Sequence, residues 1–117
     1  MSNNSLEDRV SLITGGARGI GKSIAESLAK KGSKIIIMDP GYSINGNHDD
    51  KNIAERVSEE IRDKYAIETL AITKDISIEE EVKNSIEIII KKFDKLDIVV
   101  NNAAIIRDGF IFKYSTI

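Results

Sequence analysis

The chain has 117 residues and no cysteine, so it fits one domain at most and excludes a disulfide framework, a thiolate nucleophile and a cysteine-based metal site. The formal net charge of -2 provides no basic field, so we expect neither nucleic acid nor a membrane surface as a partner. Residues 1–9 are too polar for a signal peptide and no apolar run is long enough to span a bilayer, so we expect a cytoplasmic protein.

The first predicted unit is a strand and a helix joined by a glycine-rich turn. The apolar run Val10 to Thr14 is typical of a buried strand, and a helical pattern follows from about Gly19. The pattern predicts a helix that packs on the sheet through large residues spaced four apart, with Ala25 and Ala29 beside them. These large residues are Ile20, Ile24 and Leu28.

The turn between these two elements has the composition of a phosphate-binding loop. Gly15 permits a sharp exit from the strand, Gly19 removes a side chain that would hold a ligand off the backbone, and Gly21 permits close packing of the helix. The helix N-terminus favours a pyrophosphate through its N–H groups and its dipole. The spacing Gly-x-x-x-Gly-x-Gly differs from the commoner G-x-G-x-x-G fingerprint, so a turn that binds no ligand remains the alternative at this point.

A second strand and an acid complete one βαβ unit. Gly32 ends the helical pattern, and Lys34 to Met38 is apolar at consecutive positions, as in a parallel strand covered on both faces. Asp39 follows that strand, where an acid can accept hydrogen bonds from a ribose. Its carboxylate would repel the 2′-phosphate of NADP, whereas Arg18 could pair with that phosphate. We therefore expect NAD, with NADP as the less favoured cofactor.

The segment from Pro40 to Asp50 is polar and longer than most strand-to-helix connections. His48 lies in it beside acidic residues, but neighbouring residues cannot converge on a metal without further donors, so we expect a solvated loop histidine. Asp50 or Asn52 is expected to cap the next helix, whose predicted buried stripe steps by four. That stripe is Ile53, Val57, Ile61 and Tyr65.

Two further strands and one helix follow. Thr69 to Thr73 and Leu96 to Val100 are predicted strands, and Ser77 with Glu80 forms a capping-box pattern before a helix between them. The predicted buried stripe of that helix is Ile78, Val82, Ile86, Ile89 and Phe93. Four strands alternating with three helices indicate an α/β, Rossmann-like, doubly wound parallel sheet, which binds ligands at the carboxyl ends of its strands. The glycine turn, Asp39, Asp75 and Asn102 all fall at such ends.

Two motifs resemble the short-chain dehydrogenase/reductase family. Thr14 to Gly21 matches its Thr-Gly-x-x-x-Gly-x-Gly signature, and Asn101 to Ala104 nearly matches its Asn-Asn-Ala-Gly motif, with Ala104 adding a methyl group in place of glycine. The resemblance implies that the turn binds the pyrophosphate and adenosine ribose, that Asp39 receives the ribose hydroxyls, and that later residues border the adenine or line the cofactor. The implied cofactor-binding residues are Gly15, Arg18, Gly19, Ile20, Gly21, Asp39, Asp75, Ile76, Asn102, Ala103 and Ala104. Structural roles are the alternatives for two positions, with Asp75 leading into a helix and Asn101 clamping the end of a strand.

The catalytic residues that the resemblance implies are missing from the chain. The family uses a tyrosine with a lysine four residues later, but Tyr42 and Tyr65 are followed at that spacing by Gly46 and Thr69, and Tyr114 is too near the last residue. We therefore expect residues 1–117 to be the incomplete NAD(P)-binding domain of an NAD-dependent oxidoreductase, inactive alone and a homo-oligomer when complete. The alternative is a non-catalytic dinucleotide-binding or interaction module.

The resemblance also suggests a class of substrate. The family acts on small-molecule alcohols and ketones, and the long loop at residues 40–50 together with Ile105-Ile106-Arg107-Asp108 resembles one branch of it. That branch acts on 3-hydroxyacyl thioesters, steroids or terpenoid alcohols.

Overall fold

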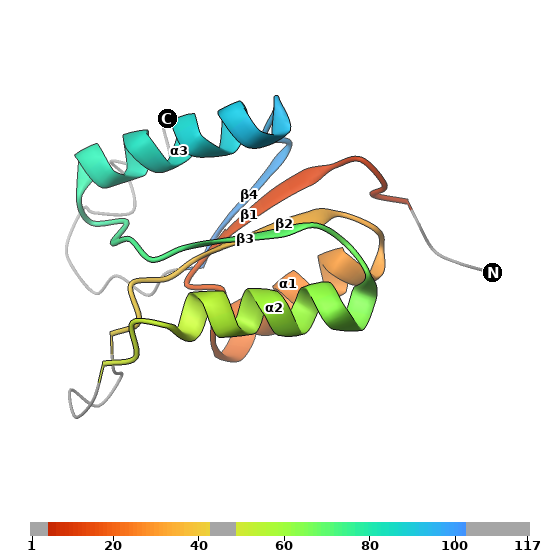
Figure 1. Ribbon diagram of the computed structural model, residues 1–117, viewed down its shortest axis with the longest axis horizontal. Helices are drawn as coiled ribbons and strands as arrows, with labels where there is room; N and C mark the ends of the chain where they lie inside the picture. Colours follow the sequence, from red (N-terminus) through yellow and green to blue (C-terminus); the bar gives the residue numbers. More distant parts are fainter. Residues whose placement is uncertain (1–4, 43–48, 103–117) are drawn as a thin grey trace.

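The computed structural model describes residues 5–42 and 49–102, which form a parallel sheet between two layers of helix (Figure 1). The strand order is β3-β2-β1-β4, and every pair of neighbours is parallel. The strands are β1 (Val10–Thr14), β2 (Lys34–Met38), β3 (Thr69–Ile72) and β4 (Ile98–Asn101). The helices are α1 (Gly19–Lys30), α2 (Ile53–Tyr65) and α3 (Glu79–Phe93). The predicted doubly wound α/β fold is confirmed.

The direction of winding reverses beside β1. The chain moves outward from β1 to β2 and β3, then α3 carries it back across the sheet to β4, which pairs with the other edge of β1. Figure 1 shows α1 and α2 on one face of the sheet and α3 on the other. Right-handed crossovers taken in opposite directions require this placement. The carboxyl ends of β1 and β4 therefore lie at the point where the strand order reverses, which is where such sheets bind ligands.

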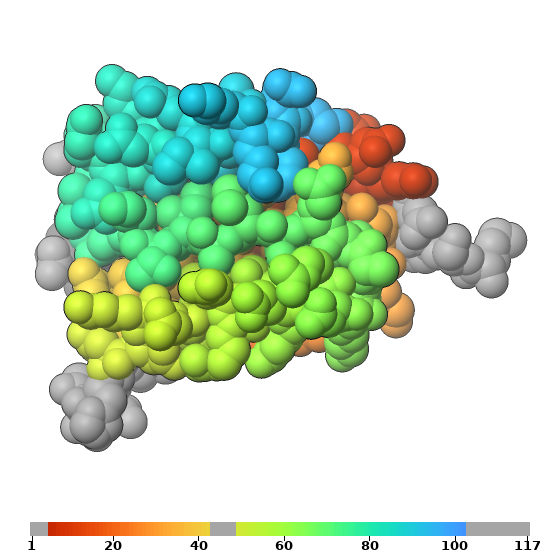
Figure 2. Space-filling view, in the orientation of Figure 1, coloured from red at the N-terminus to blue at the C-terminus, as the bar shows by residue number. Residues whose placement is uncertain are grey.

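Two hydrophobic cores explain why β2 is apolar at consecutive positions. Ile35 and Ile37 belong to the core under α1 and α2, whereas Ile36 and Met38 belong to the core under α3. All four side chains are at most 2% exposed, and burying each stabilises the fold by about 1.5–3 kcal/mol. The space-filling view shows the edge strand β3 between α3 and α2, so side chains cover the sheet on this side of the molecule (Figure 2). Among the described residues, no helix combines the length and apolar character needed to cross a bilayer.

The predicted contact face of α1 was wrong in part: Ala25 and Ala29 are in the core and Leu28 packs against it, but Ile20 does not contribute. Gly21, Ala25 and Ala29 are the buried residues of this helix, whereas Ile20 is 74% exposed. Ile24 and Leu28 are only partly buried. Small residues at the contact let the helix axis approach the strands closely, and this close approach turns the larger isoleucines outward.

The predicted start of α3 also needs correction. Ile78, rather than Ser77, occupies the N-cap position, and its side chain is 44% exposed instead of contributing to the buried stripe. Glu81, rather than Glu80, reaches back from the first turn and accepts a hydrogen bond from the backbone N–H of Asp75 (3.0 Å). The predicted buried positions Val82, Ile89 and Phe93 are buried, and Ile86 packs against them.

At the start of α2, the two candidate caps act together. Asn52 holds the N-cap position without a capping bond from its side chain, and its own N–H donates to Asp50 Oδ1 (3.1 Å). Ile53, Val57 and Ile61 are buried and Tyr65 packs against the same core, as predicted.

Candidate cofactor site

The glycine turn between β1 and α1 combines a tight backbone with an open outer face. Gly15 (φ +64°) and Gly19 (φ +52°) have left-handed backbone angles that favour glycine, and the Gly15 N–H donates to the carbonyl of Met38 (2.8 Å). A Cβ added at Gly19 would meet no atom within 4 Å. The main chain at Gly19 therefore has open space beside it on its outer side.

Gly21 is required for a different reason. A Cβ at this position would lie 2.2 Å from the carbonyl oxygen of Gly15 and 2.5 Å from Nδ2 of Asn102. The first turn of α1 therefore packs against the glycine turn and the end of β4, and not only against the sheet as the motif suggested. This packing fixes where the N-terminus of α1 lies.

The N-terminus of α1 has features that favour an anion. Arg18 is the N-cap residue, but its side chain makes no capping bond, and the first turn carries no acidic residue. The first N–H groups of a helix have no acceptor within the helix, and its dipole places positive charge there. A pyrophosphate would supply the acceptors and the negative charge that this end lacks.

Asp39 lies against the same turn, and its side chain is largely buried. The residue is 8% exposed, with Oδ2 accepting from the N–H of Ala17 (3.3 Å) and Oδ1 accepting from the N–H of Gly41 (2.8 Å). A carboxylate has about four acceptor sites, so these two bonds leave capacity for ribose hydroxyls. The carboxylate therefore points toward the glycine turn and links it to the segment after β2.

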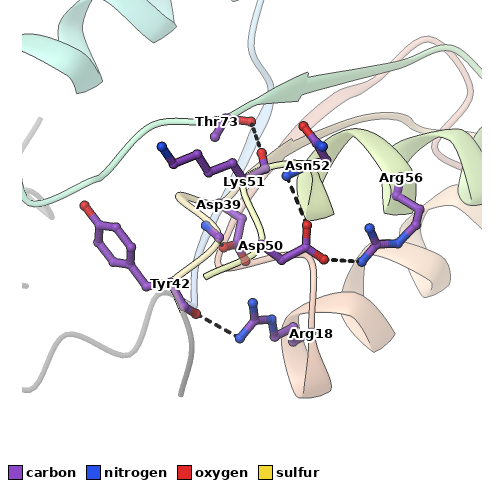
Figure 3. A network of polar contacts seen from close by, with 9 residues as sticks. Arg18, Asp39, Tyr42, Asp50, Lys51, Asn52, Arg56 and Thr73 are labelled. Atoms are coloured by element: carbon purple, nitrogen blue, oxygen red, sulfur yellow. Dashed lines mark hydrogen bonds and ion pairs between the residues drawn. The ribbon is translucent and has the colours of Figure 1, made fainter. Parts of the chain in front are cut away.

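The segment after β2 is closed at its base. The N–H of Asp50 donates to the carbonyl of Gly41 (2.7 Å), and Gly41 has a left-handed backbone (φ +81°) with its Cα close against Asp50. Asp50 also accepts a hydrogen bond from Arg56 in an ion pair, which lowers the pKa of the Asp50 carboxyl (Figure 3). His48 and the rest of residues 43–48 lie outside the described residues.

Arg18, Tyr42 and Asp75 connect the glycine turn to the end of β3. Nη1 of Arg18 donates to the carbonyl of Tyr42 (2.8 Å), as Figure 3 shows. The Tyr42 hydroxyl donates to Oδ2 of Asp75 (3.1 Å). The hydrogen bond to Asp75 and the negative charge of the Asp75 carboxylate raise the pKa of the Tyr42 hydroxyl. Asp75 Oδ1 also accepts from the N–H of Ser77 (2.8 Å), so Asp75 does lead into a helix, as the structural alternative held.

A hydrogen-bond cluster joins the carboxyl ends of β1 and β4. Thr14 Oγ1 donates to Oδ1 of Asn101 (3.0 Å) and accepts from the backbone N–H of Asn102 (3.0 Å). Asn102 Nδ2 reaches the carbonyl of Gly15 at 3.4 Å. Asn101 thus clamps the end of its strand, and Asn102 supports the glycine turn. Ala103 and Ala104 lie outside the described residues.

An apolar hollow of about 500 Å³ lies on the α3 side of these strand ends. Ile76 lines it from the connection between β3 and α3, with Val99 of β4 and Thr14 at the end of β1. Ile76 is 8% exposed and belongs to the core under α3, so it presents little surface beyond that core.

Comparison with known proteins identifies the family. A family model described as short chain dehydrogenase matches residues 9–116. The chain belongs to the short chain dehydrogenase family. It is 38% identical over 110 residues to the 3-oxoacyl-(acyl-carrier-protein) reductase FabG of Aquifex aeolicus, a match that covers 94% of this chain and 41% of that protein. It is also 36% identical to the peroxisomal hydratase-dehydrogenase-epimerase of Saccharomyces cerevisiae over 91% of this chain and 11% of that one.

Solved structures of short chain dehydrogenases have the same arrangement. Carveol dehydrogenase from Mycobacterium avium in complex with NAD superposes with a TM-score of 0.78 at 27% identity, over 91% of this chain and 39% of that one. L-sorbose reductase from Gluconobacter frateurii complexed with NADPH gives a TM-score of 0.73 at 26% identity, over 88% and 36%. The chain therefore spans about two fifths of the length of FabG and of these two solved structures, and about a tenth of the yeast protein. Both cofactors occur among the neighbours, so family membership alone does not select one.

The structure brings most of the candidate residues of this short chain dehydrogenase to one edge of the sheet. Gly15, Gly19, Gly21 and Asp39 surround the start of α1, and Asp75 joins them through Tyr42. Sequence reasoning gave Tyr42 no role in the cofactor site. Its position three residues after the acid, behind Pro40 and a turn-forming glycine, was the available signal.

Proposed function

We propose that residues 1–117 form the dinucleotide-binding domain of an NAD-dependent oxidoreductase that transfers hydride between an alcohol and a ketone. The observation that carries this proposal is the placement of Asp39, whose carboxylate accepts the Ala17 N–H of the glycine turn (3.3 Å). The main chain at Gly19, near the same helix end, is open to a ligand. A pyrophosphate at the start of α1 would place the adenosine ribose beside Asp39.

In the proposed complex, the chain's own residues bind and orient the cofactor. The N–H groups at the start of α1 would bind the pyrophosphate, and Asp39 would accept the ribose hydroxyls. Asn102 would support the turn through Gly15, with Ala103 and Ala104 continuing along the cofactor. A bound nicotinamide would supply the hydride chemistry. The tyrosine and lysine pair that family members use is absent from these 117 residues. We therefore expect the 117-residue chain to bind the cofactor without catalysing hydride transfer.

Electrostatics favours NAD over NADP in this site. A 2′-phosphate would lie against the Asp39 carboxylate, which is buried at its base and cannot swing into water without losing the N–H of Gly41. Arg18 could neutralise that phosphate, but its guanidinium already donates to the carbonyl of Tyr42 (2.8 Å). Turning Arg18 toward a phosphate would break that bond, so we expect Asp39 to decide the preference.

The relatives suggest the class of substrate. The similar proteins include a 3-oxoacyl-(acyl-carrier-protein) reductase, a carveol dehydrogenase and a hydroxysteroid dehydrogenase, whose names refer to a carbonyl or an alcohol. This range agrees with the branch suggested by the loop after β2. We therefore propose a small-molecule alcohol or ketone as the substrate of the whole protein, which we expect to act as a homo-oligomer.

Calorimetric titration of the purified protein with NAD and NADP tests the proposal. We expect NAD to bind at least about tenfold more tightly than NADP, because repulsion between the Asp39 carboxylate and the 2′-phosphate should cost about 1.4 kcal/mol or more. A sample that is folded by circular dichroism and binds neither dinucleotide would overturn the proposal. The competing function, a non-catalytic dinucleotide-binding module, predicts the same binding but no Tyr-x-x-x-Lys encoded in the DNA beyond Ile117.

A further inference from the structure

Tyr42 is an exposed aromatic residue whose backbone carbonyl and side-chain hydroxyl both make hydrogen bonds. It is 57% exposed, yet its carbonyl accepts from Arg18 (2.8 Å) and its hydroxyl donates to Asp75 (3.1 Å). Fixing an exposed tyrosine in one rotamer normally costs conformational entropy, because its ring can be hydrated in many rotamers. The two hydrogen bonds restrict the ring to the space between the glycine turn and the end of β3.

The backbone beside Tyr42 is fixed by the same residue that would receive the ribose. Oδ1 of Asp39 accepts the N–H of Gly41 (2.8 Å), and the Gly41 carbonyl closes the loop base by accepting from Asp50 (2.7 Å). The ring is therefore anchored three residues from Asp39. Figure 3 shows it extending from the loop on the side away from Arg56.

The order of groups in a dinucleotide determines what would meet this ring. With the pyrophosphate at the start of α1 and the ribose at Asp39, the next group outward is the adenine base. A purine offers a flat π face, and stacking on an aromatic ring is a common way to bind one. Tyr42 lies three residues beyond Asp39, and its hydroxyl donates to Asp75 after the end of β3 (3.1 Å).

We propose that Tyr42 is a binding residue for the adenine base, with its ring forming one wall of the adenine site and the bond to Asp75 holding that ring in place. This inference rests on the proposed function, because it uses the position of the ribose at Asp39. It adds a residue that the family motifs do not contain. Asp75 then has a second role, because it positions the aromatic wall as well as forming the turn that leads into α3.

Titration with ADP-ribose, which carries the adenosine and pyrophosphate but no nicotinamide, tests the role of the ring. Replacing the ring in Tyr42→Leu should weaken ADP-ribose binding by roughly 5- to 100-fold, the range for loss of one stacked base. Tyr42→Phe keeps the ring and loses only the bond to Asp75, so it should weaken binding by about tenfold at most. The full chain is used throughout, with thermal unfolding to confirm that each variant is folded.

Tyr65→Phe is the matched control. The Tyr65 hydroxyl also donates to a carboxylate, Glu26 (3.0 Å), but it does so at the contact between α1 and α2, away from the sheet edge. This variant should bind ADP-ribose as tightly as the wild type.

Tyrosine emission gives a readout that a purely structural role would not change. The chain has three tyrosines and no tryptophan, so stacking of adenine on Tyr42 should quench emission when ADP-ribose binds. Tyr42→Phe should lose this quenching, and Tyr65→Phe should keep it. Equal affinity of Tyr42→Leu and wild type would overturn the adenine wall while leaving the proposed function intact. Failure of the folded wild type to bind ADP-ribose would overturn both.

Discussion

Replacing Gly21 by alanine tests whether the start of α1 is packed as tightly as the structure shows. The new Cβ would lie 2.2 Å from the carbonyl oxygen of Gly15 and 2.5 Å from Nδ2 of Asn102. The asparagine amide can rotate away, but the carbonyl belongs to a turn whose N–H is bound to β2. Either α1 or the glycine turn must therefore move.

The expected loss of stability follows from two opposing effects. Adding a methyl group to a well-packed site costs about 1–3 kcal/mol, whereas replacing glycine by alanine inside a helix gains about 0.5–1 kcal/mol. The net loss should be roughly 0.5–2 kcal/mol, which corresponds to a fall of about 2–8 °C in the melting temperature of a domain of this size. Dinucleotide affinity should fall as well, because the N-terminus of α1 is displaced.

Urea unfolding and thermal melts of Gly21→Ala and Ser23→Ala measure the effect. Ser23 is an exposed residue of the same helix, so alanine there should be neutral or slightly stabilising. If Gly21→Ala is as stable as Ser23→Ala, the close contact with Gly15 does not constrain the turn and the reasoning is refuted.

Three further substitutions address the rest of the site and the fold. Asp39→Asn should weaken NAD by about tenfold or more and NADP by less, measured by calorimetry, because a charged acceptor is lost; an unchanged preference would contradict this. Thr14→Val should lower the free energy of unfolding by about 1–3 kcal/mol in urea, because the Asn102 N–H loses its acceptor, with Thr14→Ser losing less. The hydrogen bond from the backbone N–H of Val10 lowers the pKa of the Asp97 carboxyl. The free energy of unfolding of the wild type should therefore exceed that of Asp97→Asn fully above about pH 4, and this difference should vanish as the pH falls further. A pH-independent difference in urea titrations would exclude that assignment.

The fold could be predicted because local patterns and global topology agree. Consecutive apolar residues in β2 required cover on both faces, and the structure provides it, with Ile35 and Ile36 in different cores. Glycine ended α1 as predicted, since Gly32 takes a left-handed backbone (φ +97°) directly after the C-cap. Each of these features depends on a few neighbouring residues, so one sequence suffices to find it.

The contact face of α1 could not be found in this way. A four-residue step fits Ile20, Ile24 and Leu28 as well as it fits Gly21, Ala25 and Ala29, and hydrophobicity alone selects the larger set. The choice depends on how close the helix lies to the sheet, which the glycine turn determines by fixing where the helix begins. A helix that starts against the backbone of Gly15 has no room for isoleucine on its inner face.

The start of α3 was misassigned for a related reason. Ser77 and Glu80 have the spacing of a capping box, but Glu81 is the residue whose carboxylate reaches the N–H of Asp75 (3.0 Å). With acidic residues at 79, 80 and 81, the pattern cannot tell which one turns back. The outcome depends on the path of the chain after β3, which is set by packing of Ile76 into the core under α3.

The candidate site also contains one part that is set by neighbouring residues and one part that is set by contacts between distant segments. The glycine turn and Asp39 belong to one local βαβ unit, so their positions followed from spacing, whereas the link from Arg18 through Tyr42 to Asp75 joins three connections that are far apart in the sequence. This link bears on the preference between NAD and NADP. The Arg18 guanidinium, which the sequence suggested could pair with a 2′-phosphate, instead donates to the carbonyl of Tyr42. If Arg18 is needed to hold that loop, Arg18→Ala should weaken NAD as well as NADP. A loss confined to NADP would instead show that the guanidinium turns to the phosphate despite its bond to Tyr42.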